Sequence, residues 1–237
     1  MVNLHYKKSY MSKNTIIFGS SLGKKFVMSL TGLFLCSFLI VHLGGNIALF
    51  TSKDTFNEYT KFMTSNPLIR FMEIILVLGF LTHIVDAILL YIRNKNASNT
   101  KYIFDKKKSS ISSRSMALTG SFILFFLIVH LRSFWYEYKF GEVIYSEDSN
   151  GNQIKDMYHI VTSSFESPMY SLFYVSAVIL LGIHLNHGFQ SAFLSLGLRH
   201  KKYTPFISLI GKLFSFSITL GFISFPIYFC LKNFNLW

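Results

Sequence analysis

Five long runs of apolar residues constrain the fold of this chain more than any other feature. Each run is long enough to cross the hydrocarbon core of a bilayer, which takes about 20 apolar residues. A segment of this length in lipid satisfies its backbone hydrogen bonds internally as a helix. We therefore predict an all-α integral membrane protein, a bundle of five transmembrane helices over residues 26–50, 71–92, 115–136, 169–193 and 206–231.

The composition supports this prediction. The 237-residue chain is 51% hydrophobic and only 14% charged, which is too apolar for an ordinary soluble domain. We treat residues 1–237 as one transmembrane domain. The net charge of +12 does not indicate a nucleic-acid partner, because the basic residues cluster in short loops between the apolar runs.

The distribution of charge predicts how the helices are oriented. Fifteen Lys and Arg residues and a single acidic residue occur in one set of flanks, residues 1–25, 93–114 and 194–205. Six basic and eight acidic residues occur in the opposite set, residues 51–70, 137–168 and the tail after Leu231. Since cytoplasmic loops carry the excess of Lys and Arg, we expect a cytoplasmic N-terminus and a C-terminus outside.

The longest segment on the outer side, residues 137–168, predicts a small extracytoplasmic cap. It contains the polar, turn-forming sequence SEDSNGNQ, followed by the more apolar DMYHIVTSSF. Such a pattern is typical of a hairpin and an interfacial helix.

One stretch of the sequence occurs twice. Residues 30–43 and 118–131 share ten of fourteen positions at a constant offset of 88. Both copies begin Leu-Thr-Gly and carry a histidine eleven residues after the threonine (Thr31 and His42, Thr119 and His130). Eleven residues turn a helix through about three full turns, so the threonine and histidine share a face.

Five histidines lie within the predicted spans: His42, His83, His130, His184 and His187. Ionisable residues in a membrane are costly, and they usually face the bundle interior and mark functional sites. At a rise of about 1.5 Å per residue, His42 and His130 lie near the outer side, while the other three lie further inward.

Two pairs of histidines at two heights predict two stacked b-type haems, each held by a pair of imidazoles. Such ligation suits electron transfer, because no substrate can reach the iron. Gly32 and Gly120 would let a flat macrocycle approach the helix, and Ser29 and Thr31 could form hydrogen bonds near its edge. Alternatively, the glycines are packing notches and the histidines are hydrogen-bond partners between helices.

At these positions the sequence resembles a known family, the single-subunit, five-helix, di-haem cytochrome b of succinate:quinone oxidoreductases. The resemblance covers nearly the whole chain. It rests on SLTG and VHLGGN in the first span, FLTHIVDA in the second, ALTG and VHL in the third, and GIHLNHGFQSAFLSLGL in the fourth. The run HGFQSAF followed by SLGL is similar to the bacterial branch that uses menaquinone.

The resemblance implies a function and a location. The chain would anchor a flavoprotein and an iron–sulfur subunit at the cytoplasmic face of the bacterial inner membrane, and pass electrons between the iron–sulfur clusters and quinone. It would not itself act on succinate. With electron flow in the opposite direction, the same subunits would form a fumarate reductase. Two further possibilities are the haem b subunit of another quinone-linked dehydrogenase or hydrogenase, and a haem-free membrane anchor or transporter.

The resemblance also implies the iron ligands. His42 and His130 would hold the outer haem, and His83 with a fourth-span histidine would hold the inner one. The family motif selects His184 for the fourth ligand, whereas depth matching to His83 slightly favours His187.

Several other polar residues are candidates for function. Glu58, Glu73 and Arg70 cluster near the outer end of the second span, where a carboxylate could exchange protons with quinone. Glu58 and Arg70 are equally well explained as solvated loop residues. Some family members place a glutamate two residues before the fourth ligand as a proton relay, and here that position is Gly182.

Two further charged residues lie within the spans. Asp86 either accepts a hydrogen bond from His83 or pairs with a lysine on the cytoplasmic side. Lys212 either extends its ammonium group to the membrane surface or binds a haem propionate.

Overall fold

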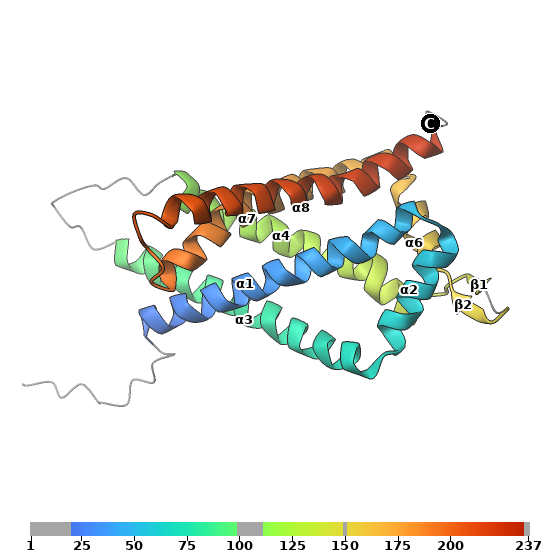
Figure 1. Cartoon of the computed structure of the whole chain (residues 1–237), viewed down its shortest axis with the longest axis horizontal. Coiled ribbons are helices and arrows are strands. Elements are labelled where there is room, and N and C mark those ends of the chain that lie inside the picture. Colours follow the sequence, from blue (N-terminus) through green and yellow to red (C-terminus); the bar gives the residue numbers. More distant parts are fainter. Residues whose placement is uncertain (1–19, 99–110, 149–150, 235–237) are drawn as a thin grey trace, which may run out of the picture.

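The computed structural model describes residues 20–98, 111–148 and 151–234, and five long helices run through it (Figure 1). They are α1 (Ser21–Asn46), α3 (Pro67–Ser98), α4 (Ile111–His130), α7 (Pro168–Ser195) and α8 (Thr204–Asn233). Each helix, together with the short helical turns that continue α1 and α4, provides a stretch long and apolar enough to cross a membrane: Leu22–Phe50, Pro67–Asn96, Ser115–Phe140, Pro168–Ser195 and Thr204–Asn233. The predicted five-helix bundle is confirmed, and the predicted boundaries differ from these by four residues or fewer.

Local sequence signals explain where these helices begin. The side chain of Ser20 caps α1 by accepting a 2.9 Å hydrogen bond from the Gly23 N–H. Ser167 caps α7 in the same way, and Pro168 occupies the first turn, where its missing N–H costs nothing. Each signal therefore lies just before an apolar run, as expected for a capped helix.

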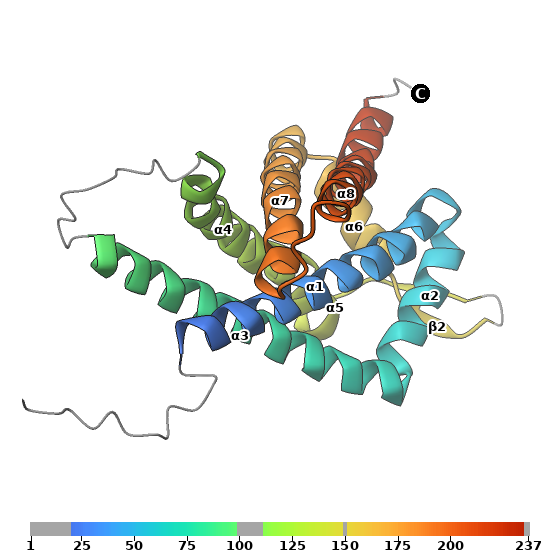
Figure 2. The same ribbon diagram turned by 60° about the vertical axis from the view of Figure 1, so that its left-hand side comes forward.

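Helix α7 occupies the centre of the bundle. It packs against α8, α1 and α4, whereas α3 packs along α1 at the edge (Figure 2). The helices alternate in direction, so the first residue of α1 and the last residue of α8 lie at opposite ends of the bundle (Figure 1).

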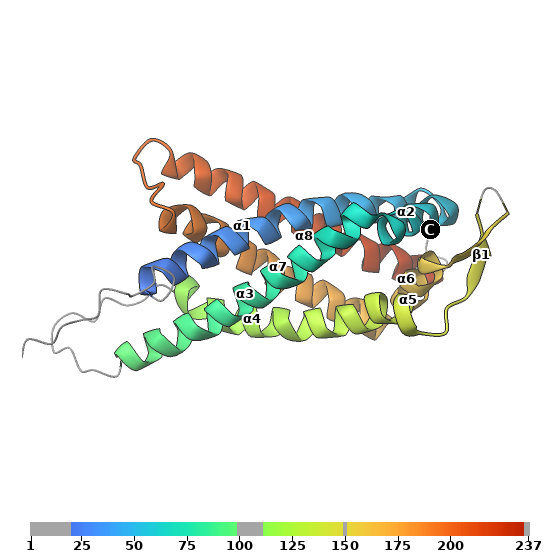
Figure 3. The same cartoon turned by 90° about the horizontal axis from the view of Figure 1, so that it is seen from below.

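One end of the bundle carries a cap. It consists of α2 (Lys53–Ser65), a hairpin of β1 (Tyr145–Glu147) and β2 (Gln153–Lys155), and α6 (Met157–Phe165) (Figure 3). The hairpin and α6 confirm the two elements expected within residues 137–168. Helix α2 was not predicted, because its polar composition is typical of a loop. The signal that identifies it is Ser52, whose hydroxyl accepts a 3.1 Å hydrogen bond from the Thr55 N–H.

Two buried polar residues tie α2 to α6. Asn57 is 1% exposed and Asp156 is 2% exposed, and the amide of Asn57 donates a 2.9 Å hydrogen bond to the Asp156 carboxylate. Lys53 adds a 2.7 Å ion pair to the same carboxylate. Burial acts to raise the pKa of Asp156, but the hydrogen bonds from Lys53 and Asn57 outweigh it and hold the pKa below its usual value.

Below the cap lies an aromatic core. Its buried members come from the cap-side ends of the long helices and from α2 and α6: Leu49, Phe56, Phe134, Val161, Phe165, Tyr174, Phe225 and Phe229. The cap is therefore packed onto the bundle. Parts of two of the basic flanks counted in the sequence, residues 1–19 and 99–110, lie outside the described residues.

Candidate functional site

Four histidines lie inside the bundle, each on a different helix. His42 on α1 and His130 on α4 lie near the cap and form what we call the cap-side pair. Their ring centroids are 5.9 Å apart and their planes are nearly perpendicular, at 89°. The structure therefore brings together the two histidines of the sequence repeat.

The spacing of the cap-side pair fits two imidazoles on opposite sides of one metal ion. With metal–imidazole bonds of about 2.0–2.1 Å, the two ring centroids would lie about 6.4 Å apart, close to the observed separation. Aromatic rings surround the pair, including Phe38, Phe126 and Phe222. The donor set and its apolar surroundings suit a bis-histidine haem.

His83 on α3 and His184 on α7 form the second pair, which we call the far-side pair. The Nδ1 atom of His83 lies 3.2 Å from the Thr31 hydroxyl, and that of His184 lies 3.3 Å from the Thr119 hydroxyl. The Leu-Thr-Gly motif of each repeat thus holds a histidine from a neighbouring helix.

The glycine of each motif lies against the same histidine. A Cβ atom on Gly32 would lie 3.5 Å from Cε1 of His83, and one on Gly120 would lie 3.7 Å from Cε1 of His184. These are ordinary contact distances, so each imidazole lies directly over its glycine, and an alanine would also fit there. The sequence alone did not indicate this contact between glycine and histidine.

The hydrogen bonds of the threonines bear on the tautomer of the far-side pair. The Thr31 hydroxyl lies 2.9 Å from the Val27 carbonyl, and the Thr119 hydroxyl lies 3.0 Å from the Ser115 carbonyl. When a hydroxyl donates its one hydrogen to that carbonyl, it accepts from the Nδ1–H of its histidine. The lone pair then lies on Nε2, which is the form of histidine that binds a metal ion.

The cap-side pair also has its Nδ1 atoms engaged. The Tyr174 hydroxyl lies 3.4 Å from Nδ1 of His130, and the Asn46 amide nitrogen lies 3.5 Å from Nδ1 of His42. These contacts are longer than those of the far-side pair. In the part of the chain that the structure describes, the Nε2 atoms of all four histidines make no hydrogen bond.

The structure distinguishes His184 from His187. His184 lies 3.3 Å from the Thr119 hydroxyl and packs over Gly120, just as His83 lies against Thr31 and Gly32. His187 lies one turn further along α7. The geometry therefore favours His184 as the partner of His83.

Glu73 and Arg70 form an ion pair near the cap end of α3. The Trp135 indole N–H donates a 2.9 Å hydrogen bond to the other oxygen of Glu73. Glu58, in contrast, lies on the exposed side of α2. Of the three quinone-site candidates, the structure therefore joins Glu73 and Arg70. It adds Trp135 to them, which sequence reasoning missed.

A change in helix geometry positions Trp135. Directly after His130 the chain forms a π-helical turn, η3 (Leu131–Tyr136), before the short helix α5 (Glu137–Phe140). Such turns are rare and frequently occur at functional sites. Trp135 lies within this turn, five residues after His130, and the turn has no obvious signal in the sequence.

Gly182 lies against Thr219 of α8. A Cβ atom at this position would overlap the hydroxyl of Thr219. A larger side chain here would therefore require the Thr219 side chain to move.

Two other candidates have partners of their own. Asp86 on α3 pairs with Lys24 on α1 at 3.4 Å, so the pairing with a lysine, the second of its two interpretations, is confirmed. The buried Ser29 hydroxyl donates to the Lys25 carbonyl at 2.8 Å, and no described histidine is bonded to it.

The five apolar helices define the class of the protein, a multi-pass helical membrane protein. No family model, curated protein or solved structure matches the chain. Among the described residues, no three His, Cys, Asp or Glu side chains gather as a metal site built from protein ligands alone would require.

Proposed function

We propose that the chain is the membrane anchor and di-haem b electron-transfer subunit of a succinate:quinone oxidoreductase. One observation carries this proposal: four helices each direct a histidine into the bundle, in two pairs at two heights. The sequence motifs and the hydrogen bonds point to the same four residues. Menaquinone is the proposed quinone, on the resemblance to the bacterial branch.

The chain's own residues would hold the cofactors. His42 and His130 would bind the cap-side haem, and His83 and His184 the far-side haem, the latter two through Nε2. Thr31 and Thr119 would fix the far-side rings in the ligating tautomer. When bound, the haems supply one-electron transfer, and the bundle supplies their spacing and a dry interior.

The Glu73 carboxylate is the proposed proton-exchanging group of a quinone site. It lies near the cap-side histidines along the bundle, and Arg70 and Trp135 hold it in place. A carboxylate held between two donors can take up a proton as quinol is oxidised, or release one as quinone is reduced. Glu58, being exposed on α2, is the weaker candidate.

The charges support an orientation with the cap outside the cell. The end opposite the cap carries Lys24, Lys25, Arg93, Lys95, Arg199, Lys201 and Lys202 among the described residues. This end would face the cytoplasm of a bacterium, in keeping with the excess of Lys and Arg there. The flavoprotein and iron–sulfur subunits would bind at this face.

The proposal is tested by the haem content of the purified protein. A pyridine haemochrome assay, combined with a reduced-minus-oxidised difference spectrum, should show two protohaems per chain that titrate at separable potentials. Finding one haem would assign one histidine pair to a structural role. Finding none, in a protein expressed with adequate haem supply, would overturn the electron-transfer function.

A further inference from the structure

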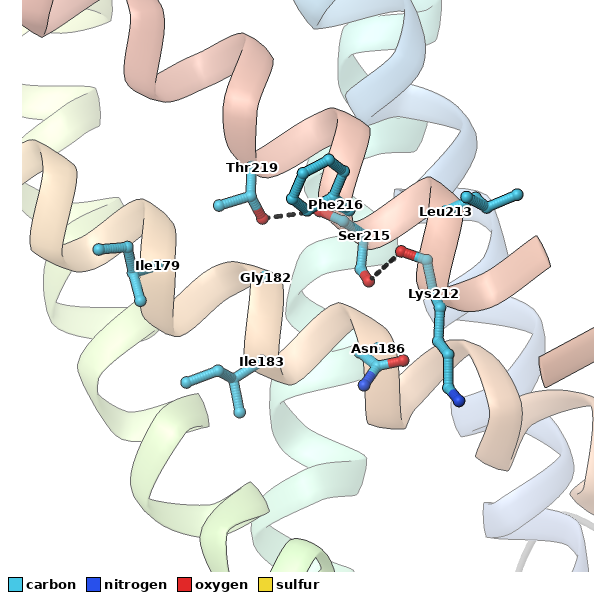
Figure 4. A pocket seen from close by; sticks show the side chains of 9 residues that line it. All are labelled: Ile179, Gly182, Ile183, Asn186, Lys212, Leu213, Ser215, Phe216 and Thr219. Carbon is cyan, nitrogen blue, oxygen red and sulfur yellow. Dashed lines mark hydrogen bonds between the residues drawn. The ribbon is translucent and has the colours of Figure 1, made fainter. Parts of the chain in front are cut away.

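A groove of about 510 Å³ lies between α7 and α8, and its lining is unusual for a surface that faces lipid (Figure 4). Ile183 and Phe216 on its walls are 49% and 63% exposed, which is ordinary for a membrane-facing helix. The polar residues Asn186, Lys212, Ser215 and Thr219 also line it. The groove therefore combines an apolar wall with polar side chains.

The groove is separate from the predicted haem ligands. On α7, Asn186 follows His184 by two residues, which turns it about 200° around the helix axis. His184 faces Thr119 on α4, whereas Asn186 faces α8. A ligand in the groove would thus occupy the opposite side of α7 from the histidine pairs.

One end of the groove offers hydrogen-bond donors. In the described part of the chain, the Lys212 ammonium group has no ion pair or hydrogen bond. The Asn186 carbonyl oxygen accepts a 2.9 Å hydrogen bond from Gln190, and Gln190 in turn accepts one from Ser208. This chain of bonds leaves the Asn186 NH₂ group to donate into the groove.

The other hydroxyl groups of the groove have already used their hydrogens. Ser215 donates to the Lys212 carbonyl at 3.0 Å, and Thr219 donates to the Ser215 carbonyl at 2.7 Å. The hydrogen-bond donors that remain in the groove are the Lys212 ammonium group and the Asn186 amide. A ligand that complements them carries negative charge and acceptor oxygens but needs no donor of its own, as in a phosphodiester.

The depth of Lys212 agrees with the phosphate level of a bilayer. Helix α8 has 30 residues, so it is about 45 Å long and extends roughly 7 Å beyond each side of a 30 Å hydrocarbon core. Lys212 lies eight residues from the start, about 12 Å along the axis and thus about 5 Å inside the core. Its flexible stem can lift the ammonium group back to the interface.

The surrounding charge also favours an anion. Between residue 168 and the end of the sequence there is no acidic residue. The loop that joins α7 to α8 adds the exposed Arg199, Lys201 and Lys202 at the same end as Lys212. No carboxylate of these two helices competes for the cation.

We propose that this groove is a binding site for one anionic phospholipid. The phosphate binds Lys212 and the Asn186 amide, and an acyl chain lies along Ile179, Ile183 and Phe216. The site lies outside the proposed haem and quinone sites, so it stands independently of the proposed function.

Native mass spectrometry of the full-length chain in detergent tests the proposal, with phosphatidylglycerol and phosphatidylcholine as probes. We expect the wild type to retain phosphatidylglycerol in preference to phosphatidylcholine. Lys212→Gln should weaken phosphatidylglycerol binding about fivefold, the loss expected for one lysine near a membrane surface. The matched control is Lys232→Gln, which removes a lysine from the other end of the same helix and should leave binding unchanged.

A second variant tests the apolar wall. Ile183→Trp should fill the groove and weaken binding of both lipids, while the helical circular dichroism stays that of the wild type. Equal retention of the two lipids by the wild type would overturn the proposal. So would equal losses in Lys212→Gln and Lys232→Gln, or displacement of bound phosphatidylglycerol by a short-chain menaquinone, which would assign the groove to quinone.

Discussion

The hydroxyl of Thr31 lies 3.2 Å from Nδ1 of His83, and it joins the first repeat of the sequence to a histidine on another helix. Thr119 and His184 repeat this relationship at 3.3 Å. The repeated Thr-Gly therefore positions the far-side histidines, while the repeated histidines pair with each other at the cap side. Each copy of the repeat thus contributes to both histidine pairs.

Replacing the threonine should weaken haem binding at the far-side pair alone. Thr119→Val removes the acceptor for Nδ1–H of His184, and loss of such a ligand-orienting bond typically lowers metal affinity about 10–100-fold. Thr119→Ser should restore binding. Haem titration of the purified protein measures the effect, and Thr82→Val is the control, since that exposed hydroxyl bonds only to its own helix. An equal loss in Thr82→Val would contradict the role of Thr119.

Single histidine variants should remove one haem each. His42→Ala or His130→Ala should abolish the cap-side haem absorbance, and His83→Ala or His184→Ala the far-side one. His187→Ala should keep both haems, because the threonine motif holds His184. Redox-resolved difference spectra distinguish the two haems. Retention of the far-side haem in His184→Ala, with its loss in His187→Ala, would reverse the ligand assignment.

Trp135→Phe should slow quinone turnover while leaving haem content intact. The substitution keeps an aromatic ring but removes the N–H that bonds the Glu73 carboxylate. A hydrogen bond to a charged group contributes about 1.5–3 kcal/mol, so a decrease of at least about tenfold is expected. Tyr136→Phe is the neighbouring control. Quinone-dependent haem oxidation measures the rate, and an unchanged rate in Trp135→Phe would remove Trp135 from the site.

Gly182→Ala should destabilise the bundle, because the new methyl group would overlap the Thr219 hydroxyl. Inserting one methyl group into a close contact costs about 1–3 kcal/mol. Adding Thr219→Ala should recover most of the loss, since that change removes the overlapping atom. Thermal unfolding in detergent compares the single and double variants. Additive destabilisation would show that the two positions do not meet.

Low pH should destabilise the cap by protonating the Asp156 carboxylate. The pKa of Asp156 is lowered in the folded protein, so its contribution to stability is complete above the unfolded pKa of about 3.8 and is lost as pH falls through the folded value. Asp156→Asn keeps an acceptor oxygen for the α6 cap but removes the negative charge that pairs with Lys53, which costs about 1–3 kcal/mol at pH 7. The stability difference from the wild type should shrink below pH 3.8. A difference that is independent of pH would place the effect elsewhere.

The number, length and order of the spanning helices could be predicted from sequence because a bilayer allows so few arrangements. Helix α2 could not be predicted from the sequence, because a 13-residue polar helix is stabilised by contacts that form only in the folded protein. Its Asn57 meets Asp156, which lies 99 residues later in the sequence.

Likewise, only part of the candidate site could be predicted from the sequence. The histidines were identifiable because a titratable residue in an apolar run is conspicuous. Tyr174 and Trp135 were not, because an aromatic residue in a membrane helix is common and its partner is known only once the helices are packed. The choice of His184 over His187 likewise depends on where Thr119 lies on the neighbouring helix.

The central place of α7 has a consequence for how the protein is made. Helices α1 and α3 can pair as soon as both have left the ribosome, but α1, α4 and α8 all pack against a helix that begins at Pro168. During synthesis, α1 and α4 therefore lie in the membrane without their contacts to α7 until that helix is inserted. The far-side histidine pair is completed only when α7 is inserted, so the order of translation sets the earliest moment at which that pair could bind the proposed haem.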